Sequence, residues 1–333
     1  MGKIVLGFPA TDELVHQIKT AAREHEVVLA KQEELPQLLP EADLFCGHVK
    51  VPVDWPAIVA AGNLKWIQSS AAGLDHCMHP AVVESNITVS GASALFANQV
   101  AETATALLFG LIRNMKTFHD AQKQRIYSRK YTDDLTGKSL GIIGLGGNGQ
   151  RIAQVMRPWV TQIVGTDVFD DQTIEGVDKI YPPSALVQVL NQSDVVIITL
   201  PLTEETNSVF GRYEFDAMRP GSYLINVGRG SVVDTDELIR AIEQGKFSGV
   251  GIDVVDPEPL PYESPLWEME NVVITPHIGA QSKRRLTDTT DVFCENLARF
   301  RAGEKLLNLV DKKLGFPRPE NRVPLDWRTK SLS

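Results

Sequence analysis

The stretch that decides the fold of this 333-residue chain is Leu140-Gly141-Ile142-Ile143-Gly144-Leu145-Gly146-Gly147-Asn148-Gly149. Its first four residues form a short apolar run typical of a buried strand, and the rest matches a Gly-x-Gly-x-x-Gly turn. Such a turn bends tightly, lets the backbone approach a pyrophosphate, and packs the next helix closely on the strand. The helix N-terminus then offers unpaired N–H groups to the phosphates. The stretch predicts a dinucleotide site, although an ordinary glycine-rich turn can have the same spacing.

An acidic residue at the end of the next predicted strand favours NAD over NADP. Asp167 follows the apolar run 163–166, about 20 residues beyond the glycines, where a carboxylate can accept hydrogen bonds from the ribose hydroxyls. The same carboxylate repels a 2′-phosphate. The cofactor-binding residues predicted from this region are Gly144, Gly146, Gly147, Asn148, Gly149 and Asp167.

Strand-like and helical segments alternate along most of the chain. The predicted strands are 4–8, 27–30, 44–47 and 66–69 in the first part, and 140–143, 163–166, 195–199, 223–227, 250–254 and 272–275 in the second. Alternation of this kind predicts an α/β fold with parallel sheets. The second set has the six strands of a dinucleotide-binding sheet.

A predicted helix over residues 100–115 has apolar or small residues on both of its faces. A helix of this kind is buried on both sides. One side can cover its own sheet, and the other then requires another domain or a second subunit. We therefore expect a homodimer that forms through the dinucleotide domain.

Composition excludes several other classes of protein. Apolar residues make up 43% of the chain and charged residues 23%, as in ordinary globular domains, and the net charge of −9 with scattered basic residues argues against nucleic-acid binding. No apolar run approaches the roughly 18 residues of a membrane span, and the N-terminus lacks a signal-peptide pattern. Three cysteines do not make a disulfide framework, so we expect a cytoplasmic protein. His76, Cys77 and His79 lack a further ligand cluster, and no metal site is expected.

Three chemically active side chains follow predicted strands. Arg229 lies between two glycines after one strand, Glu258 lies between two prolines after another, and His277 follows the last. Open α/β sheets bind ligands at the carboxyl ends of their strands, so these side chains can converge beside a nicotinamide ring. Each also has a plainer interpretation: a solvated arginine, a turn-capping carboxylate and a structural histidine.

Here the chain resembles the D-isomer-specific 2-hydroxyacid dehydrogenase family, over roughly residues 66–315. The resemblance rests on three motifs that occur in order: Met218-Arg219-Pro220-Gly221 through Asn226, Arg229 and Val233-Asp234; Asp256-Pro257-Glu258-Pro259-Leu260 through Pro265-Leu266-Trp267; and Thr275-Pro276-His277. It implies that Arg229 binds the substrate carboxylate and polarises the keto oxygen. His277 would be the acid/base, and Glu258 would bind its other nitrogen and favour the imidazolium form.

The resemblance implies further site residues. Asp253 would contact the nicotinamide amide, and the remaining residues of the cofactor groove would be Leu200, Pro201, Val227, Gly228 and Gly279. The loop 70–75 would bind the substrate carboxylate through the N–H groups of Ala72 and Gly73. Phe96 would lie near the substrate side chain, although it can equally belong to the core. Thr199 departs from the His or Asn of many members, with no functional meaning that the sequence reveals.

The family also implies a discontinuous first domain with the dinucleotide domain inserted into it. Residues 1–99 and 284–333 would form a flavodoxin-like substrate domain, and residues 100–283 an NAD-binding Rossmann domain. Between two such domains the resemblance implies a hinged cleft that closes over the substrate.

The function implied is NAD-dependent interconversion of a small 2-keto acid and its D-2-hydroxy acid. Glyoxylate, hydroxypyruvate, pyruvate-like acids and 3-phosphoglycerate all fit this chemistry, and the sequence does not choose among them. The alternative is a non-enzymatic NAD(H)-sensing interaction protein of the corepressor type, because such proteins keep the same catalytic residues. Turnover on a panel of 2-keto acids distinguishes the two functions.

Overall fold

A computed structural model describes residues 2–327, and the chain divides into two compact units. One unit combines the two chain ends, Met1–Phe96 and Ser282–Ser333, and the other is the continuous segment Ala97–Gln281. The domain boundaries expected from the sequence lie within a few residues of these divisions. The assignment of substrate binding to one domain and cofactor binding to the other stays a prediction.

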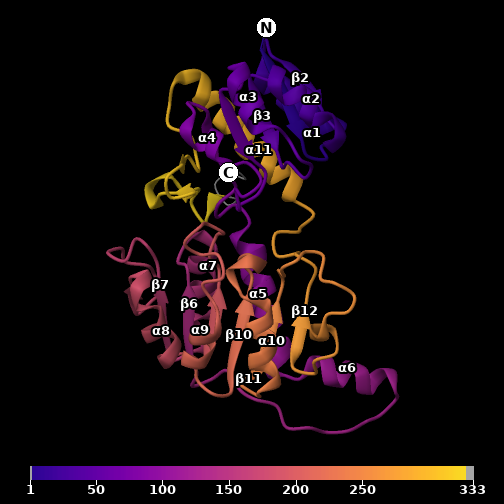
Figure 1. The fold of residues 1–333 in the computed structure, drawn as a ribbon, viewed down its shortest axis with the longest axis vertical. Coiled ribbons are helices and arrows are strands. Elements are labelled where there is room, and N and C mark those ends of the chain that lie inside the picture. Colours follow the sequence, from indigo (N-terminus) through magenta and orange to yellow (C-terminus); the bar gives the residue numbers. More distant parts are fainter. Residues whose placement is uncertain (1, 328–333) are drawn as a thin grey trace. The chain divides into compact units, whose positions relative to one another are not determined.

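A parallel five-stranded sheet forms the centre of the unit made from the chain ends (Figure 1). Its strand order, β2-β1-β3-β4-β5, is the flavodoxin-like order of doubly wound sheets. The strands are β1 (Lys3–Gly7), β2 (Glu26–Leu29), β3 (Leu44–Gly47), β4 (Trp66–Ser69) and β5 (Thr88–Ser90). The helices are α1 (Asp12–Ala22), α2 (Leu35–Leu38), α3 (Trp55–Ala61), α4 (Pro80–Glu84) and α11 (Arg285–Ala302).

Trp66 shows why a helix near the end of the chain belongs to this unit. Its ring stacks on Phe293 and on Phe300 of α11, with ring centroids 5.3 Å apart in each pair. Its Nε1–H donates a 2.8 Å hydrogen bond to Ser90 Oγ in β5. Trp66 is fully buried, so the core on this face of the sheet is complete only when α11 packs against it.

The second unit contains a parallel sheet of seven strands in the order β12-β11-β10-β9-β6-β7-β8 (Figure 1). The order changes direction between β6 and β9, the point at which sheets of this type bind their ligands. The strands are β6 (Ser139–Ile143), β7 (Gln162–Thr166), β8 (Lys179–Tyr181), β9 (Val195–Ile198), β10 (Ser222–Asn226), β11 (Phe247–Ile252) and β12 (Val272–Ile274). The expected α/β class with parallel sheets is confirmed, with β8 as an additional strand.

Helices cover both faces of this sheet, and each face has its own apolar core. Helices α5 (Ala97–Ile112) and α7 (Gly147–Met156) contribute to one core, and α8 (Leu186–Gln192), α9 (Arg212–Ala217) and α10 (Thr235–Glu243) contribute to the other. The central strands β6, β9 and β10 are buried along their whole length, which explains their apolar runs.

The helix expected over residues 100–115 is in fact two helices. Helix α5 ends at Ile112, and α6 (Met115–Lys123) begins after Asn114, whose φ of +53° is left-handed. Asparagine tolerates this conformation, and its Nδ2 donates a hydrogen bond to Tyr131 O at 3.0 Å. Along α5, Glu102 and Ala106 are exposed in the single chain. The outer side of α5 is thus the side for which a second subunit was expected.

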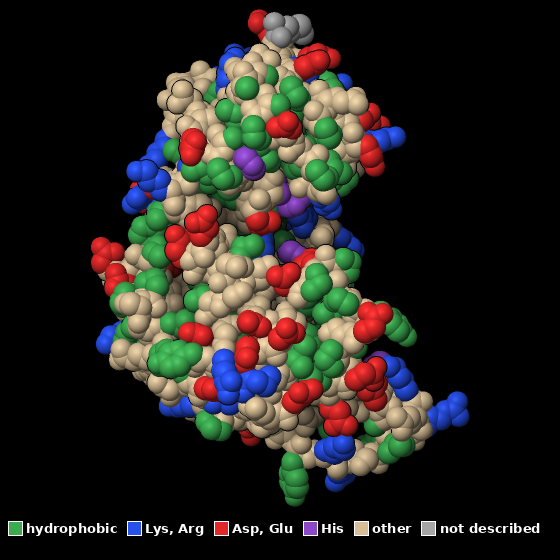
Figure 2. Space-filling view, viewed as in Figure 1, with side chains coloured by type: hydrophobic (Ala, Val, Ile, Leu, Met, Phe, Trp, Pro, Cys, Tyr) green, Lys and Arg blue, Asp and Glu red, His purple; other side chains and the backbone are tan. Residues whose placement is uncertain are grey.

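The surface is mixed in charge. Figure 2 shows Lys and Arg side chains interspersed with Asp and Glu on the face drawn, in keeping with a net charge of −9. Among the described residues, none of the helices has the length and apolar character needed to cross a bilayer.

Candidate active site

The glycine turn after β6 has a backbone that only glycine fits at two positions. Gly144 has a φ of +94°, and a Cβ on Gly149 would lie 2.1 Å from Gly144 O. Gly146 is the N-cap residue of α7, and a Cβ there would meet no atom within 4 Å. Gly147 and Asn148 begin the helix. No described atom therefore crowds Gly146 on its Cβ side, as close approach of a pyrophosphate to the helix N-terminus requires.

Asp167 lies next to this turn, at the carboxyl end of β7. Its Oδ2 accepts a hydrogen bond from Leu145 N at 2.8 Å, and its Oδ1 accepts one from Phe169 N at 2.9 Å. The side chain is held on both oxygens, and the residue is 9% exposed. Asp170 and Asp171 follow on the exposed surface. The structure thus places a fixed carboxylate beside the glycine turn, as a ribose-binding residue requires.

The loops after β9 and β10 pack directly on each other. A Cβ on Gly228 would lie 2.7 Å from Leu200 O, so only glycine lets these backbones approach so closely. Pro201 and Val227 are the adjoining residues of the same two loops. Thr199 Oγ1 donates hydrogen bonds to Gly144 O at 2.5 Å and to Ile143 O at 3.3 Å. Thr199, for which the sequence suggested no role, therefore links the end of β9 to the glycine turn by hydrogen bonds.

Arg229 follows β10 in a loop whose backbone is held by hydrogen bonds to the side chain of Asn226. Asn226 Oδ1 accepts a hydrogen bond from Gly228 N, and its Nδ2 donates one to Arg229 O, both at 3.0 Å. Arg229 Nη1 donates to Gly228 O at 2.8 Å. A Cβ on Gly230 would lie 1.9 Å from Val255 O, so there is no room for a side chain at position 230, directly after Arg229. The glycines predicted to allow close backbone packing around Arg229 do so.

His277 and Glu258 form a pair. His277 Nδ1 lies 2.7 Å from Glu258 Oε1, and the side chains are 42% and 44% exposed. An imidazole that binds a carboxylate through Nδ1 keeps Nε2 for proton exchange with a substrate. The structure therefore brings together the two residues that were expected to form an acid/base pair.

Asp253 holds the loop that carries His277. This buried carboxylate accepts hydrogen bonds from Thr275 Oγ1 (2.6 Å), Ile278 N (2.9 Å) and Gly279 N (2.8 Å). Its own backbone oxygen accepts from His277 N at 2.7 Å. His277 has a φ of +52°, a left-handed conformation that these bonds support on both sides.

Sequence reasoning assigned Asp253 to the nicotinamide amide and overlooked its part in this loop. It also missed Thr275. A small hydroxyl residue directly after a buried strand was the available signal, because such residues commonly bond to nearby backbone and carboxylates. The predicted cofactor contacts of Asp253 and Gly279 stay predictions.

Of the substrate-binding residues expected on the other unit, Ala72 and Gly73 follow β4, and Phe96 follows β5. Ala72 is exposed, and among the described residues no protein group accepts a hydrogen bond from the N–H of Ala72 or Gly73. Phe96 is 2% exposed, and the guanidinium carbon of Arg285 lies 5.4 Å from its ring centroid. Burial lowers the pKa of Arg285. Phe96 is thus packed in the core, and contact between it and a substrate stays a prediction.

The three cysteine thiols lie at buried or half-buried positions. All three cysteines are free, and burial raises the pKa of Cys294 to about 11. Within residues 2–327, no three His, Cys, Asp or Glu side chains are grouped in a way that could hold a metal ion. The cytoplasmic location stays a prediction.

Comparison with known proteins identifies the family. Residues 105–279 match the family "D-isomer specific 2-hydroxyacid dehydrogenase, NAD binding domain". A glyoxylate reductase of Thermofilum pendens is 29% identical over 88% of each chain. A D-3-phosphoglycerate dehydrogenase of Archaeoglobus fulgidus is 29% identical over 93% of this chain and 59% of its own length.

Structural comparison agrees with these relatives. The crystal structure of a D-isomer specific 2-hydroxyacid dehydrogenase family protein from Aeromonas salmonicida has a TM-score of 0.78 and 28% identity, over 93% of this chain and 99% of that one. The family match spans more than half of the chain and includes the glycine turn, Arg229 and the Glu258–His277 pair. The resemblance inferred from the sequence is confirmed: the chain belongs to the D-isomer specific 2-hydroxyacid dehydrogenase family and is a nicotinamide-dependent oxidoreductase of 2-hydroxy acids.

Proposed function

We propose that the protein uses NADH to reduce a small 2-keto acid to the D-2-hydroxy acid. The observation that carries this proposal is the 2.7 Å pair between His277 Nδ1 and Glu258 Oε1, on a loop held by the buried Asp253. A fixed imidazole can donate a proton to a keto oxygen during reduction, and among residues 2–327 no hydrogen-bond partner is seen for His277 Nε2.

The residues divide the work as follows. Bound NADH supplies the hydride. Protonated His277 donates its Nε2 proton to the keto oxygen, and neutral His277 accepts that proton in the oxidation direction. Glu258 keeps the ring oriented through the contact at Nδ1. Arg229 binds the substrate carboxylate with two parallel N–H donors. The N–H groups of Ala72 and Gly73 are the proposed carboxylate donors of the other unit.

NAD is preferred to NADP in this proposal because of the segment after β7. Asp167 is fixed beside the glycine turn by hydrogen bonds from Leu145 N and Phe169 N, whereas Asp170 and Asp171 are exposed. A 2′-phosphate placed there would face the negative charge of Asp167. The residues that bind the adenosine ribose would therefore discriminate against NADP.

Four acids define the proposed substrate range: glyoxylate, hydroxypyruvate, pyruvate and the 2-keto acid derived from 3-phosphoglycerate. The test is NADH oxidation, followed by absorbance, with each of these acids and with the purified protein. Turnover of at least one acid supports the proposal. Tight NADH binding without turnover of any of them would instead support an NAD(H)-sensing interaction protein.

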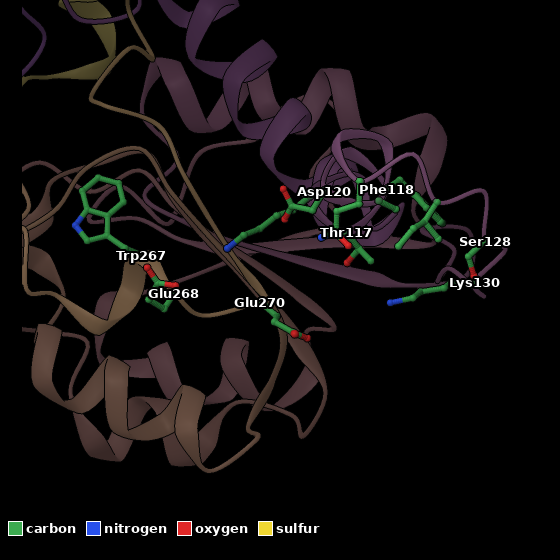
Figure 3. A pocket seen from close by; sticks show the side chains of 12 residues that line it. Thr117, Phe118, Asp120, Ser128, Lys130, Trp267, Glu268 and Glu270 are labelled. Atoms are coloured by element: carbon green, nitrogen blue, oxygen red, sulfur yellow. The ribbon is translucent and has the colours of Figure 1, made fainter.

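A homodimer through the dinucleotide domain is the proposed assembly. Helix α6 and the segment that follows it border a pocket of about 570 Å³, with Trp267, Glu268 and Glu270 on another side (Figure 3). Beyond the helix, Tyr127 and Tyr131 are 98% and 101% exposed. Two fully exposed tyrosines on one segment are typical of a surface that a partner covers.

Two substitutions test this assembly. Tyr127→Asp together with Tyr131→Asp should shift the protein from dimer to monomer in sedimentation equilibrium. In the proposed dimer each tyrosine ring buries about 150–250 Å² against the partner, and an aspartate removes this apolar contact. Tyr262→Asp is the matched control, since Tyr262 is 92% exposed but lies outside this segment. An unchanged mass in the double variant would place the dimer interface elsewhere.

A further inference from the structure

A histidine outside the proposed catalytic pair connects two loops of the unit made from the chain ends. His76 lies in the loop after β4, and its Nδ1 accepts a hydrogen bond from Val49 N, in the loop after β3, at 3.3 Å. Its Nε2 lies 2.8 Å from Ser69 Oγ, at the end of β4. The imidazole therefore joins the carboxyl ends of two neighbouring parallel strands, β3 and β4.

The hydrogen atoms of this group can be assigned from its geometry. A backbone N–H only donates, so Nδ1 of His76 must be the acceptor, and the neutral ring then carries its hydrogen on Nε2. Nε2–H donates to Ser69 Oγ, which also accepts from Ala71 N at 3.1 Å. The hydroxyl hydrogen of Ser69 donates to Ala71 O, also at 3.1 Å. The fully buried hydroxyl thus makes three hydrogen bonds, two accepted and one donated.

The loop that receives His76 is itself fixed. Gln32 Nε2 donates to His48 O at 2.9 Å, and Gln32 Oε1 accepts from Lys50 N at 2.8 Å. The His48 ring lies against the His76 ring, with their centroids 4.0 Å apart. His76 is therefore held by a ring on one face and by hydrogen bonds at both nitrogens.

The hydrogen bonds of His76 and Ser69 reach as far as Ala71, the residue before the proposed carboxylate-binding N–H groups. Ala71 is bonded twice to Ser69, and its oxygen also accepts from Ala92 N at 3.0 Å. Ala72 and Gly73 come next, and their N–H groups donate to no group among the described residues. The direction of these two N–H groups depends on the backbone that Ser69 and His76 hold.

We propose that His76 and Ser69 are a positioning pair that orients the N–H groups of Ala72 and Gly73 toward the substrate carboxylate. This inference rests on the proposed function for the role of those N–H groups. The neutral form of His76 is the one that completes the network, because a hydrogen on Nδ1 would face Val49 N–H. Neither side chain takes part in proton transfer to the keto oxygen.

The test compares Ser69→Ala, His76→Phe and the double variant. His76→Phe keeps a ring against His48 but loses both hydrogen bonds. Each single variant should raise KM for the keto acid by about 10- to 100-fold, as expected for a small misplacement of binding groups. The Kd for NADH, measured by fluorescence, should not change. The effects on kcat/KM should be strongly non-additive in the double variant, because both changes break the same connection.

Two further variants separate positioning from general stability. His76→Gln keeps an N–H donor for Ser69 and should recover part of the loss in KM. His79→Gln is the control, since His79 lies on the same segment but is exposed and caps α4 through Ala81 N. A KM increase of equal size in His79→Gln, or an unchanged KM in His76→Phe, would overturn the proposal.

Amide hydrogen exchange tests the pair without any substrate. Peptides covering residues 70–78 should exchange faster in Ser69→Ala and His76→Phe than in the wild type, and His79→Gln should match the wild type. If the wild-type protein reduces no 2-keto acid, the proposed function fails while the exchange rates still decide whether the pair holds the loop. Unchanged exchange in both variants would refute the pair itself.

Discussion

Replacing Asp167 with serine should change the choice between NADH and NADPH. The variant removes a carboxylate that is 9% exposed and fixed by Leu145 N–H and Phe169 N–H, and with it the charge that repels a 2′-phosphate. Each hydrogen bond from a ribose hydroxyl of NADH to the charged carboxylate would contribute about 1.5–3 kcal/mol to cofactor binding. Part of this loss is offset in the variant because the serine hydroxyl can still bind the ribose. We expect the ratio of kcat/KM for NADPH and NADH to rise by about 1–3 kcal/mol, or about 5- to 150-fold.

The assay measures initial rates with both cofactors at a fixed, saturating 2-keto acid. Asp167→Asn is a second variant, because its amide oxygen can still accept one of the two backbone N–H groups while the charge is gone. Asp170→Ser is the matched control: it removes an exposed carboxylate three residues away. Thermal melts separate a cofactor effect from lost stability. A wild-type preference for NADPH, or an equal change of ratio in the Asp170 variant, would refute the reasoning.

Three other predictions address the remaining charges. Arg229→Lys should raise KM and lower kcat in steady-state assays, because an ammonium group cannot form the two parallel hydrogen bonds of a guanidinium; near-wild-type kinetics would remove Arg229 from the site. Glu258→Gln keeps an acceptor for His277 Nδ1 but removes the negative charge beside a ring that must donate a proton during reduction, so reduction should fall more than oxidation; equal losses in both directions would contradict this. Burial alone would raise the pKa of Asp194, but hydrogen bonds from a backbone N–H and from Arg219 lower it on balance. Its contribution to stability is therefore present above the unfolded pKa of about 4 and lost as pH falls further. In urea unfolding, Asp194→Asn should be less stable than the wild type at neutral pH, and the difference should shrink below about pH 4.

The sequence predicted most of the fold because its information is local and periodic. Buried parallel strands are continuous apolar runs, and the glycines after β6 are required by backbone geometry within a few residues. The same reasoning missed β5 and β8, which have only three residues each. It also continued a helix through Asn114, because an apolar pattern does not reveal one left-handed residue.

For the candidate site, the sequence alone determined which residue types follow which strands. In a parallel sheet the carboxyl ends lie along one edge, so Arg229, Glu258 and His277 could be grouped without coordinates. The tertiary structure alone decided how they are held. Asp253 is fixed to the His277 loop by three hydrogen bonds, and the His76 ring connects Ser69 to Val49 in the neighbouring loop. Such contacts join residues far apart in sequence, and no local pattern records them, because they depend on distances that arise only when the strands pair.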